Sequence, residues 1–552
     1  MPNLATYWHT VRHLKTVQIY GRLVRALPRR PKLSAAGTYG LSPPEGSWTE
    51  TCRQVPSMLA PDSFRFLNEE RTLLWPQGWG DAAMPLLWLY NLHYFDDFNT
   101  AGAGERARWH EELLDRWIRD NPVGTNPGWD SYPTSLRIVN WIKWDLETKL
   151  LPNQARLSLG QQASWLSSHL EWHLLGNHLF ANAKALVFAG CYFDGPEASR
   201  WLARGQRIVG EQLQEQILPD GGNFELSPMY HAIFLADLLD LVNLGTCYPG
   251  KARTALQTKL RGEARKMLNW LRAMVHPDGE IALFNDSAFG IAATLGELEA
   301  YAARLGIELP ARAPTWPSHA PSLILLAESG YARLECSEAV AICDVARVGP
   351  DYLPGHAHAD TLSFELSVRG RRFIVNGGTS RYGSDEARVA ERGTRAHSTV
   401  TVDDSDSSEV WSGFRVARRA KPFKVGSVVM ENAARLEASH DGYTRLHRSI
   451  IHRRSWEMTA RALTVEDFVT GTAKRATARF LLHREIDAEQ RPANTWVLRH
   501  PDVDGEVHLS VLKGEARIEP AWHSVRFGER LPTKALAIEL LSGRAKVEIA
   551  WS

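Results

Sequence analysis

The sequence predicts a protein of two parts, a mainly helical first half followed by a β-rich second half. Apolar residues recur at helical spacing from about residue 47 to residue 328, as in Trp109–Ile118 and Phe234–Leu241. Beyond that region, apolar and polar residues alternate, which is typical of strands. Four prolines between Pro310 and Ser322 mark the connection. We therefore expect three segments: residues 1–46, a helical domain at 47–325 and a β domain at 326–552.

The helical half should contain many helices of about 12 to 20 residues, and no short sequence repeat is present. This pattern favours helical hairpins packed in a ring or an arc. Residues Leu170–Gly190 are predicted as one long helix. Another helix should begin at Ser227-Pro228, because Ser is a good N-cap and Pro fits the first helical position.

The β half begins with a predicted hairpin. Leu362–Val368 alternates apolar and polar residues, Arg369-Gly370 supplies a turn, and Arg372–Val375 returns. Short runs rich in Val, Ile and Thr continue this pattern to the carboxyl end and predict an antiparallel sandwich. These runs are His397–Val402, Arg448–Ile451, Trp496–Arg499 and Val547–Trp551.

Composition excludes several classes of protein. The chain has 64 Lys and Arg against 63 Asp and Glu, a net charge of +1, so we expect no nucleic-acid partner. No apolar run approaches the roughly 18 residues of a membrane span. The five cysteines contain no Cys-x-x-Cys, which argues against a disulfide framework and against a thiolate zinc site.

The amino end is basic. Met1–Pro44 holds seven Lys and Arg and no acidic residue, and it lacks the apolar stretch of a secretory signal. The expected location is therefore cytoplasmic. The segment is interpreted as a helix packed on the main body, or as a peripheral contact with a membrane or an acidic polysaccharide through basic residues 12–32.

Three short segments of the chain concentrate polar and titratable residues. The first, Gly176–Lys184, places Asn177 and His178 in an apolar helix. The second, Asp220–His231, holds Glu225 and places Tyr230 in a first helical turn, where free backbone N–H groups would stabilise a phenolate. The third is Pro354–Asp360. If this segment is extended, His356, His358 and Asp360 project to one side, which suits a metal or an acid and base pair.

Further polar residues follow the third cluster. Asn376–Tyr382 and Arg392–Val400 add Asn376, Tyr382 and His397. Arg388, Arg392 and Arg395 are spaced by four and three residues and would share one face. Guanidinium groups bind carboxylate or sulfate well, so these arginines are candidate substrate-binding residues; a solvated basic face is the alternative.

In this order and at this separation, the motifs resemble those of the heparinase II/III-like polysaccharide lyases, which include oligoalginate lyases. The resemblance covers nearly all of the chain after the basic segment. It implies an incomplete (α/α) toroid followed by an antiparallel β-sandwich, with an acidic uronic-acid polysaccharide in the cleft between them. The implied reaction is β-elimination, which yields an unsaturated uronyl product. Such a reaction needs donors that neutralise the uronate carboxyl group, a base for the proton on carbon 5 and an acid for the oxygen leaving carbon 4.

The resemblance also implies roles for single residues. Asn177 and His178 match the carboxylate neutralisers, and Tyr230 matches the acid. His356 matches the second proton-transfer group, with Tyr382 as another candidate base. Glu225 is a candidate for substrate contact.

A zinc ion supports the site in several relatives. The matching positions here are His358, Asn376 and His397, and the family has Asp where this chain has Asn376. A neutral amide in place of a carboxylate should weaken zinc binding. No organic cofactor is expected. Relatives are mostly exported, so the periplasm is the alternative location.

Two other functions compete with the lyase. A glycoside hydrolase on the same kind of toroid would use Glu225, Asp220 or Glu171 as acid and base. A binding or scaffolding protein for an acidic exopolysaccharide would retain affinity without turnover.

Overall fold

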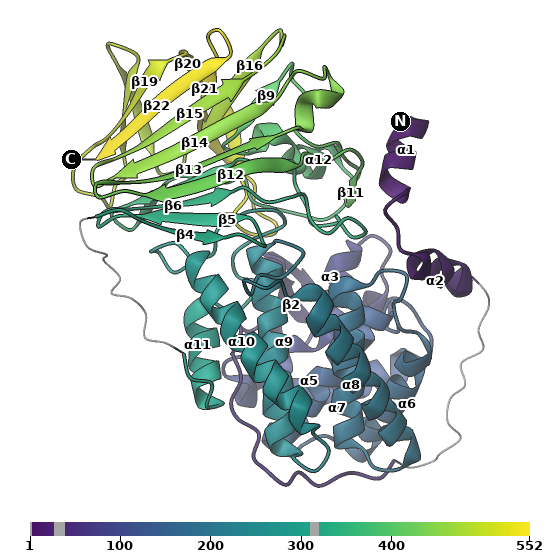
Figure 1. Cartoon of the computed structure of the whole chain (residues 1–552). Coiled ribbons are helices and arrows are strands. Elements are labelled where there is room, and N and C mark those ends of the chain that lie inside the picture. Colours follow the sequence, from purple (N-terminus) through teal and green to yellow (C-terminus); the bar gives the residue numbers. More distant parts are fainter. Residues whose placement is uncertain (1–2, 27–38, 310–319, 552) are drawn as a thin grey trace.

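The computed structural model describes residues 3–26, 39–309 and 320–551. Figure 1 shows most helices gathered in one body and the large sheets stacked on it. The α-helices are α1 (Leu4–Val11), α2 (Thr16–Ala26), α3 (Leu86–Tyr94), α4 (Ala107–Asp120), α5 (Ser131–Thr148), α6 (Asn153–Ser168), α7 (Gly176–Tyr192), α8 (Pro196–Gln216), α9 (Pro228–Cys247), α10 (Thr254–Ala273), α11 (Leu295–Arg304) and α12 (Glu386–Arg392).

The strands fall into two groups along the chain. A short group, β1 (Met58–Ala60), β2 (Ser63–Phe66) and β3 (Glu69–Thr72), precedes most of the helices. The others are β4 (Ser322–Leu326), β5 (Tyr331–Glu335), β6 (Ala339–Asp344), β7 (Phe364–Val368), β8 (Arg371–Ile374), β9 (Val400–Val402), β10 (Val410–Trp411), β11 (Arg415–Val416), β12 (Pro422–Val429), β13 (Ala433–His440), β14 (His452–Thr459), β15 (Ala462–Val469), β16 (Ala476–Leu481), β17 (Asp487–Arg491), β18 (Thr495–Arg499), β19 (Val507–Lys513), β20 (Glu515–His523), β21 (Leu531–Glu539) and β22 (Arg544–Trp551).

The predicted order, a helical half followed by antiparallel sheets, is confirmed. In the helical half α7 packs against α5 and α8, while α9 packs against α10 and α11, around one apolar core that includes Trp117, Trp141 and Leu186. None of the helices within the described ranges is long and apolar enough to cross a membrane. The three-stranded sheet β1–β3 was not expected, because strands of three or four residues are too short to leave a clear period in the sequence.

The prediction of one helix over Leu170–Gly190 is wrong. Helix α6 ends at Ser168 and α7 begins at Gly176. Leu175 and Gly176 have positive φ values of 67° and 54°, which the interior of a right-handed helix cannot accommodate. The break places Asn177 and His178 in the first turn of α7, where an uninterrupted helix would have left them in its middle.

The second half stacks three antiparallel sheets. Their strand orders are β4-β5-β6-β7-β8, β12-β13-β14-β15-β22-β19-β18-β17 and β20-β21-β16-β9. Every residue of β6 is buried because its two faces belong to different cores: Ala341 and Cys343 pack with the large sheet, whereas Val340 and Ile342 pack with Trp270 of the helical half. The five-stranded sheet therefore lies between the helices and the large sheet.

The predicted hairpin at Leu362–Val375 is confirmed as β7 and β8, with Arg369 and Gly370 at positive φ in the turn. The strands predicted at Trp496–Arg499 and Val547–Trp551 are confirmed as β18 and β22. A strand at Arg448–Ile451 is wrong, because these residues lie in the loop before β14. Of His397–Val402, the part Val400–Val402 forms β9.

Candidate active site

The predicted proton-transfer residues meet where the helical half contacts the sheets. Tyr230 stands in the first turn of α9, which begins where predicted: the Ser227 side chain accepts a hydrogen bond from the Tyr230 amide. The Tyr230 hydroxyl lies 2.8 Å from the hydroxyl of Tyr382, which follows β8. The His356 ring lies against Tyr230, with 3.9 Å between ring centroids. Residues 152 positions apart in the chain are thus brought into direct contact.

Asp286 holds this cluster together, and sequence reasoning missed it. The carboxylate is buried, and its oxygens lie 2.9 Å from His356 Nδ1, 2.8 Å from His358 Nε2 and 2.7 Å from Arg388 Nη2. Because a carboxylate only accepts, Nδ1 of His356 carries the proton in this contact. The only signal in the sequence is the polar run Asn285-Asp286-Ser287 between apolar residues, which any turn could show.

The charge of Asp286 follows from these contacts. Burial alone would raise the pKa of this carboxyl group, but the Arg388 guanidinium and the hydrogen bonds from His356 and His358 hold the pKa well below its usual range. Asp286 is therefore an anion that fixes the orientation of two imidazoles.

The two tyrosines are protonated in the resting protein. Burial raises the pKa of Tyr230 well above its ordinary value, and the neighbouring Tyr382 hydroxyl raises it further. Burial likewise raises the pKa of Tyr382, and Asp286 adds to the shift. Each phenol is thus a proton donor rather than a phenolate at neutral pH.

Asn177 and His178 lie on the other side of Glu225. The backbone N–H of Asn177 donates to Glu225 Oε1 at 3.3 Å, and Glu225 Oε2 lies 3.5 Å from His356 Nε2. His178 Nδ1 lies 3.1 Å from Glu171 Oε1. Glu225 therefore links the α7 turn to the His356 cluster. Burial raises the pKa of the Glu225 carboxyl group, while the nearby His356 lowers it in part.

The pKa of His178 is raised. Burial acts to lower it, but the Glu171 carboxylate, which pairs with the ring, outweighs burial. The imidazole therefore stays charged to a higher pH than an ordinary histidine, which suits a group that neutralises a carboxylate.

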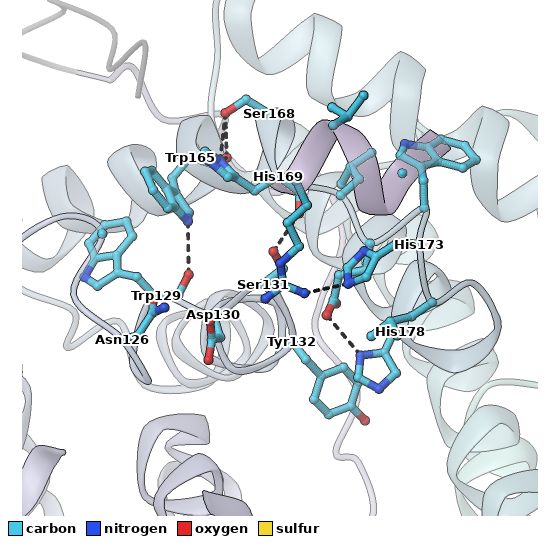
Figure 2. A pocket seen from close by; sticks show the side chains of 18 of the residues that line it. Asn126, Trp129, Asp130, Ser131, Tyr132, Trp165, Ser168, His169, His173 and His178 are labelled. Carbon is cyan, nitrogen blue, oxygen red and sulfur yellow. Dashed lines mark hydrogen bonds and ion pairs between the residues drawn. The ribbon is translucent and has the colours of Figure 1, made fainter. Parts of the chain in front are cut away.

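A cavity of about 850 Å³ opens beside this end of the site (Figure 2). Trp129, Trp165 and His169 line it from one side, and Tyr132 and His178 reach into it from the helix ends below. Helix α2 forms part of the wall, where Arg25 lies 2.5 Å from His173 Nε2. Aromatic walls with a few polar groups are typical of carbohydrate sites because ring faces stack on sugars.

Arg388 and Arg392, which the sequence predicts to bind substrate, are both buried and bound within the protein. Arg388 is bound to Asp286, and Arg392 donates to the carbonyl oxygens of Ala357 and Ser412. Arg395 is exposed but lies outside α12 and pairs with Glu519 at 3.1 Å, so the three arginines do not share a face. Arg388 and Arg392 hold the loops of the site in place.

The three positions predicted to bind zinc are buried and close together. The His358 and His397 rings are 5.3 Å apart, and His397 Nδ1 contacts Asn376 Oδ1. His358 Nδ1 and His397 Nε2 have no hydrogen-bond partner among the described residues. Burial lowers the pKa of His358 to about 4, so its ring is neutral, as a metal ligand must be.

A second group could hold a metal, and the sequence analysis did not find it. His483, Glu485 and His500 place one donor atom each within 4.8 Å of one another. Glu485 Oε2 lies 3.2 Å from His500 Nε2. The Asp502 amide donates to His500 Nδ1 at 3.1 Å, which leaves the proton of the neutral ring on Nε2. Metal binding through Nε2 therefore requires the other tautomer, with the proton on Nδ1 and without the hydrogen bond from Asp502.

Helices, antiparallel sheets and a cluster of phenols and imidazoles at their junction define a protein built like the polysaccharide lyases. Residues 150–303 match the heparinase II/III N-terminus, and residues 319–552 match the heparinase II/III-like C-terminal domain. The chain belongs to the heparinase II/III-like family.

Individual relatives are distant. The chain is 27% identical over 348 residues to a heparin-sulfate lyase of Pedobacter heparinus, a match that covers 56% of this chain and 50% of the enzyme, so it spans about half of that relative's length. It is 26% identical over 361 residues to FtsZ-localized protein C of Caulobacter vibrioides, covering 59% and 58%. A crystal structure of heparinase III superposes with a TM-score of 0.66 and 19% identity over 83% of this chain and 76% of that one. At this low sequence identity, the similarity to heparinase III is evidence for the fold alone.

Proposed function

We propose that this protein is a polysaccharide lyase that cleaves an acidic polysaccharide at a uronic acid by β-elimination. The observation that carries the proposal is the contact of Tyr230, Tyr382 and His356 at the junction of the two halves. These residues supply two protonated phenols and one imidazole, which are the groups that an elimination needs.

The proposed steps use these groups in turn. His178 and the Asn177 side chain bind the uronate carboxylate and stabilise the charge that develops on it. His356 Nε2 takes the proton from carbon 5, because Asp286 holds the other ring nitrogen in its protonated form. The bond between carbon 4 and the glycosidic oxygen then breaks, and the Tyr230 hydroxyl donates its proton to the leaving oxygen. Tyr382 keeps Tyr230 in position. After the product leaves, the proton on His356 passes back to Tyr230, and both groups regain their starting forms.

A hydrolase is less well supported by the carboxylates. Asp220 accepts hydrogen bonds from the amides of Gly222, Glu328 and Ser329, so it holds a loop. Glu171 is bound to His178 and Asn182. A non-catalytic binding protein is the second candidate, because one relative carries a name that gives a location rather than a reaction.

The direct test is ultraviolet absorbance. Purified protein is incubated with heparan sulfate, hyaluronan, chondroitin sulfate, alginate and bacterial exopolysaccharides that contain uronic acid. We expect one class of polymer to give a rising absorbance from the conjugated uronyl product. Reducing ends formed without that absorbance would indicate a hydrolase, and binding without either product would indicate the scaffolding function.

Zinc is not assigned a step in this proposal. The imidazoles of His358 and His397 offer two nitrogen ligands. The third ligand expected of this zinc site is a carboxylate, and Asn376 has none. Its Oδ1 already accepts a hydrogen bond from Gly377 and contacts His397. The three residues therefore do not fit a three-ligand zinc centre.

Replacing Asn376 by Asp should restore zinc binding. The substitution puts a negative charge beside His397, and we expect zinc per chain, measured by elemental analysis after purification without chelators, to rise from a small fraction towards one. A zinc content of one ion per chain in the wild type, equal to that of the variant, would contradict this expectation.

The pH dependence should depend on Glu171. Since His178 must be charged to neutralise the substrate carboxylate and its pKa is raised in the folded protein, activity is retained below this pKa and lost as the pH rises through it. In Glu171→Gln the main contact that raises this pKa is gone, so the alkaline limb of kcat/KM should move to lower pH. Glu197→Gln, which changes a carboxyl group bound to Ser164, is the control and should leave the limb in place.

A further inference from the structure

Helices α1 and α2 lie beside the main body rather than within it (Figure 1). Their inner sides are held by a few contacts. The Tyr7 ring meets Trp411 at 5.2 Å, and Trp411 Nε1 donates to Thr10 at 3.1 Å. On α2, the Gln18 side chain donates to the Tyr352 carbonyl oxygen at 3.2 Å. These contacts fix the pair of helices to the second half of the protein, and the contact of Arg25 with His173 fixes α2 to the first half.

Their outer sides are apolar. In α1 the side chains of Leu4, Trp8 and Val11 are 89%, 62% and 43% exposed, and their spacing of four and three residues places them on one face. In α2, Ile19 and Leu23 are 50% and 65% exposed and are four residues apart. No residue of α1 is buried. Large apolar side chains gathered at this density on a surface mark a binding face rather than ordinary surface variation.

The charge of the segment has one sign. Residues 3–26 contain Arg12, Lys15, Arg22 and Arg25 and no acidic residue. Within the described ranges, Arg12 and Arg22 form no ion pair with a carboxylate, while Lys15 pairs with Glu215. Exposed apolar side chains next to unpaired cations match the chemistry of an anionic lipid surface, where the acyl region takes the apolar groups and the headgroups attract the cations.

We infer that α1 and α2 form a docking face for an anionic lipid bilayer, on which the protein lies as a peripheral protein. Leu4, Trp8, Ile19 and Leu23 enter the interface, and Arg12 and Arg22 contact the headgroups. This inference is independent of the proposed reaction, because none of these residues belongs to the Tyr230 cluster.

The test is sedimentation of the full chain with vesicles of phosphatidylcholine alone or with a third of phosphatidylglycerol. Wild type should pellet with the anionic vesicles and stay in solution with the neutral ones. A triple variant, Leu4→Ser, Trp8→Ser and Leu23→Ser, should bind at least tenfold more weakly. The matched control is Val428→Ser with Val429→Ser on strand β12, where the two side chains are 49% and 55% exposed; it should bind like wild type.

Circular dichroism and the melting temperature check that all variants are folded. Absence of pelleting of the wild type with anionic vesicles would overturn the inference, as would equal binding of the triple variant. Self-association in sedimentation velocity that the triple variant abolishes, without vesicle binding, would overturn it too and identify the face as a contact between two copies. Binding to an anionic polysaccharide but not to vesicles would likewise overturn it.

Discussion

Tyr230→Phe removes the proposed acid and should lower kcat for the unsaturated product by about a thousandfold, within the range known for loss of a positioned proton-transfer group. The phenylalanine ring keeps the stacking on His356, so KM and the fold should change little. Absorbance kinetics on the active polymer measure kcat, and a binding assay on the same polymer checks that affinity is retained.

Tyr301→Phe is the matched control. This tyrosine is also buried, and its hydroxyl donates to Asp240, but it belongs to the helical core. The hydroxyl also accepts from the Asn243 side chain, so the substitution removes two buried hydrogen bonds; it should cost about 2–3 kcal/mol of stability and leave kcat unchanged. If Tyr230→Phe keeps more than a tenth of the activity and Tyr382→Phe does not, then Tyr382 is the acid.

Asp286→Asn should be the most damaging single change at the site. It leaves the buried Arg388 guanidinium without its carboxylate, and breaking a buried ion pair in this way costs about 3–5 kcal/mol. The neutral amide also no longer holds His356 Nδ1 in its protonated form, so we expect activity per folded molecule to fall at least a hundredfold. Chemical denaturation measures the first effect and kinetics the second.

Asp467→Asn separates the two effects. Asp467 is a buried carboxylate bound to Arg454 and His452 in the large sheet. It therefore has the same kinds of partner as Asp286 but lies outside the candidate active site. Both variants should lose stability by a similar amount, and only Asp286→Asn should lose activity per folded molecule. Equal kinetic effects of the two substitutions would show that Asp286 acts through the fold alone.

Parts of the site were predictable because their signals are local. Ser227-Pro228 predicts a helix start from capping alone, and this start places Tyr230 in the first turn. Asn177 and His178 were predicted as site residues, but inside a long helix. The break before Gly176 rests on the left-handed backbone of Leu175, and nothing in the residue type of a leucine signals this conformation.

Other parts depended on partners far away in the chain. Arg388 and Arg392 are four residues apart, a spacing typical of a basic helix face turned to solvent. Both residues do lie in a helix, α12. They are nevertheless buried, because Asp286 and the carbonyl oxygens of Ala357 and Ser412 come to them from other loops. Glu365 is similar: strand alternation suggests an exposed position, but this face of β7 meets the helical half. There Glu365 contacts His276, and Arg372 of β8 pairs with it as well.

The sequence by itself determined the fold class, the hairpin of β7 and β8 and the start of α9, because apolar period, capping and turn residues are properties of neighbouring positions. The roles of the tyrosines and histidines follow from the family resemblance and stay predictions. Only the tertiary structure decided that Asp286 organises those groups, that two of the three arginines are buried, and that α1 and α2 turn an apolar, cationic face to solvent. A hydrogen bond or a buried surface depends on which segments meet in space, and that pairing leaves no local pattern in the sequence.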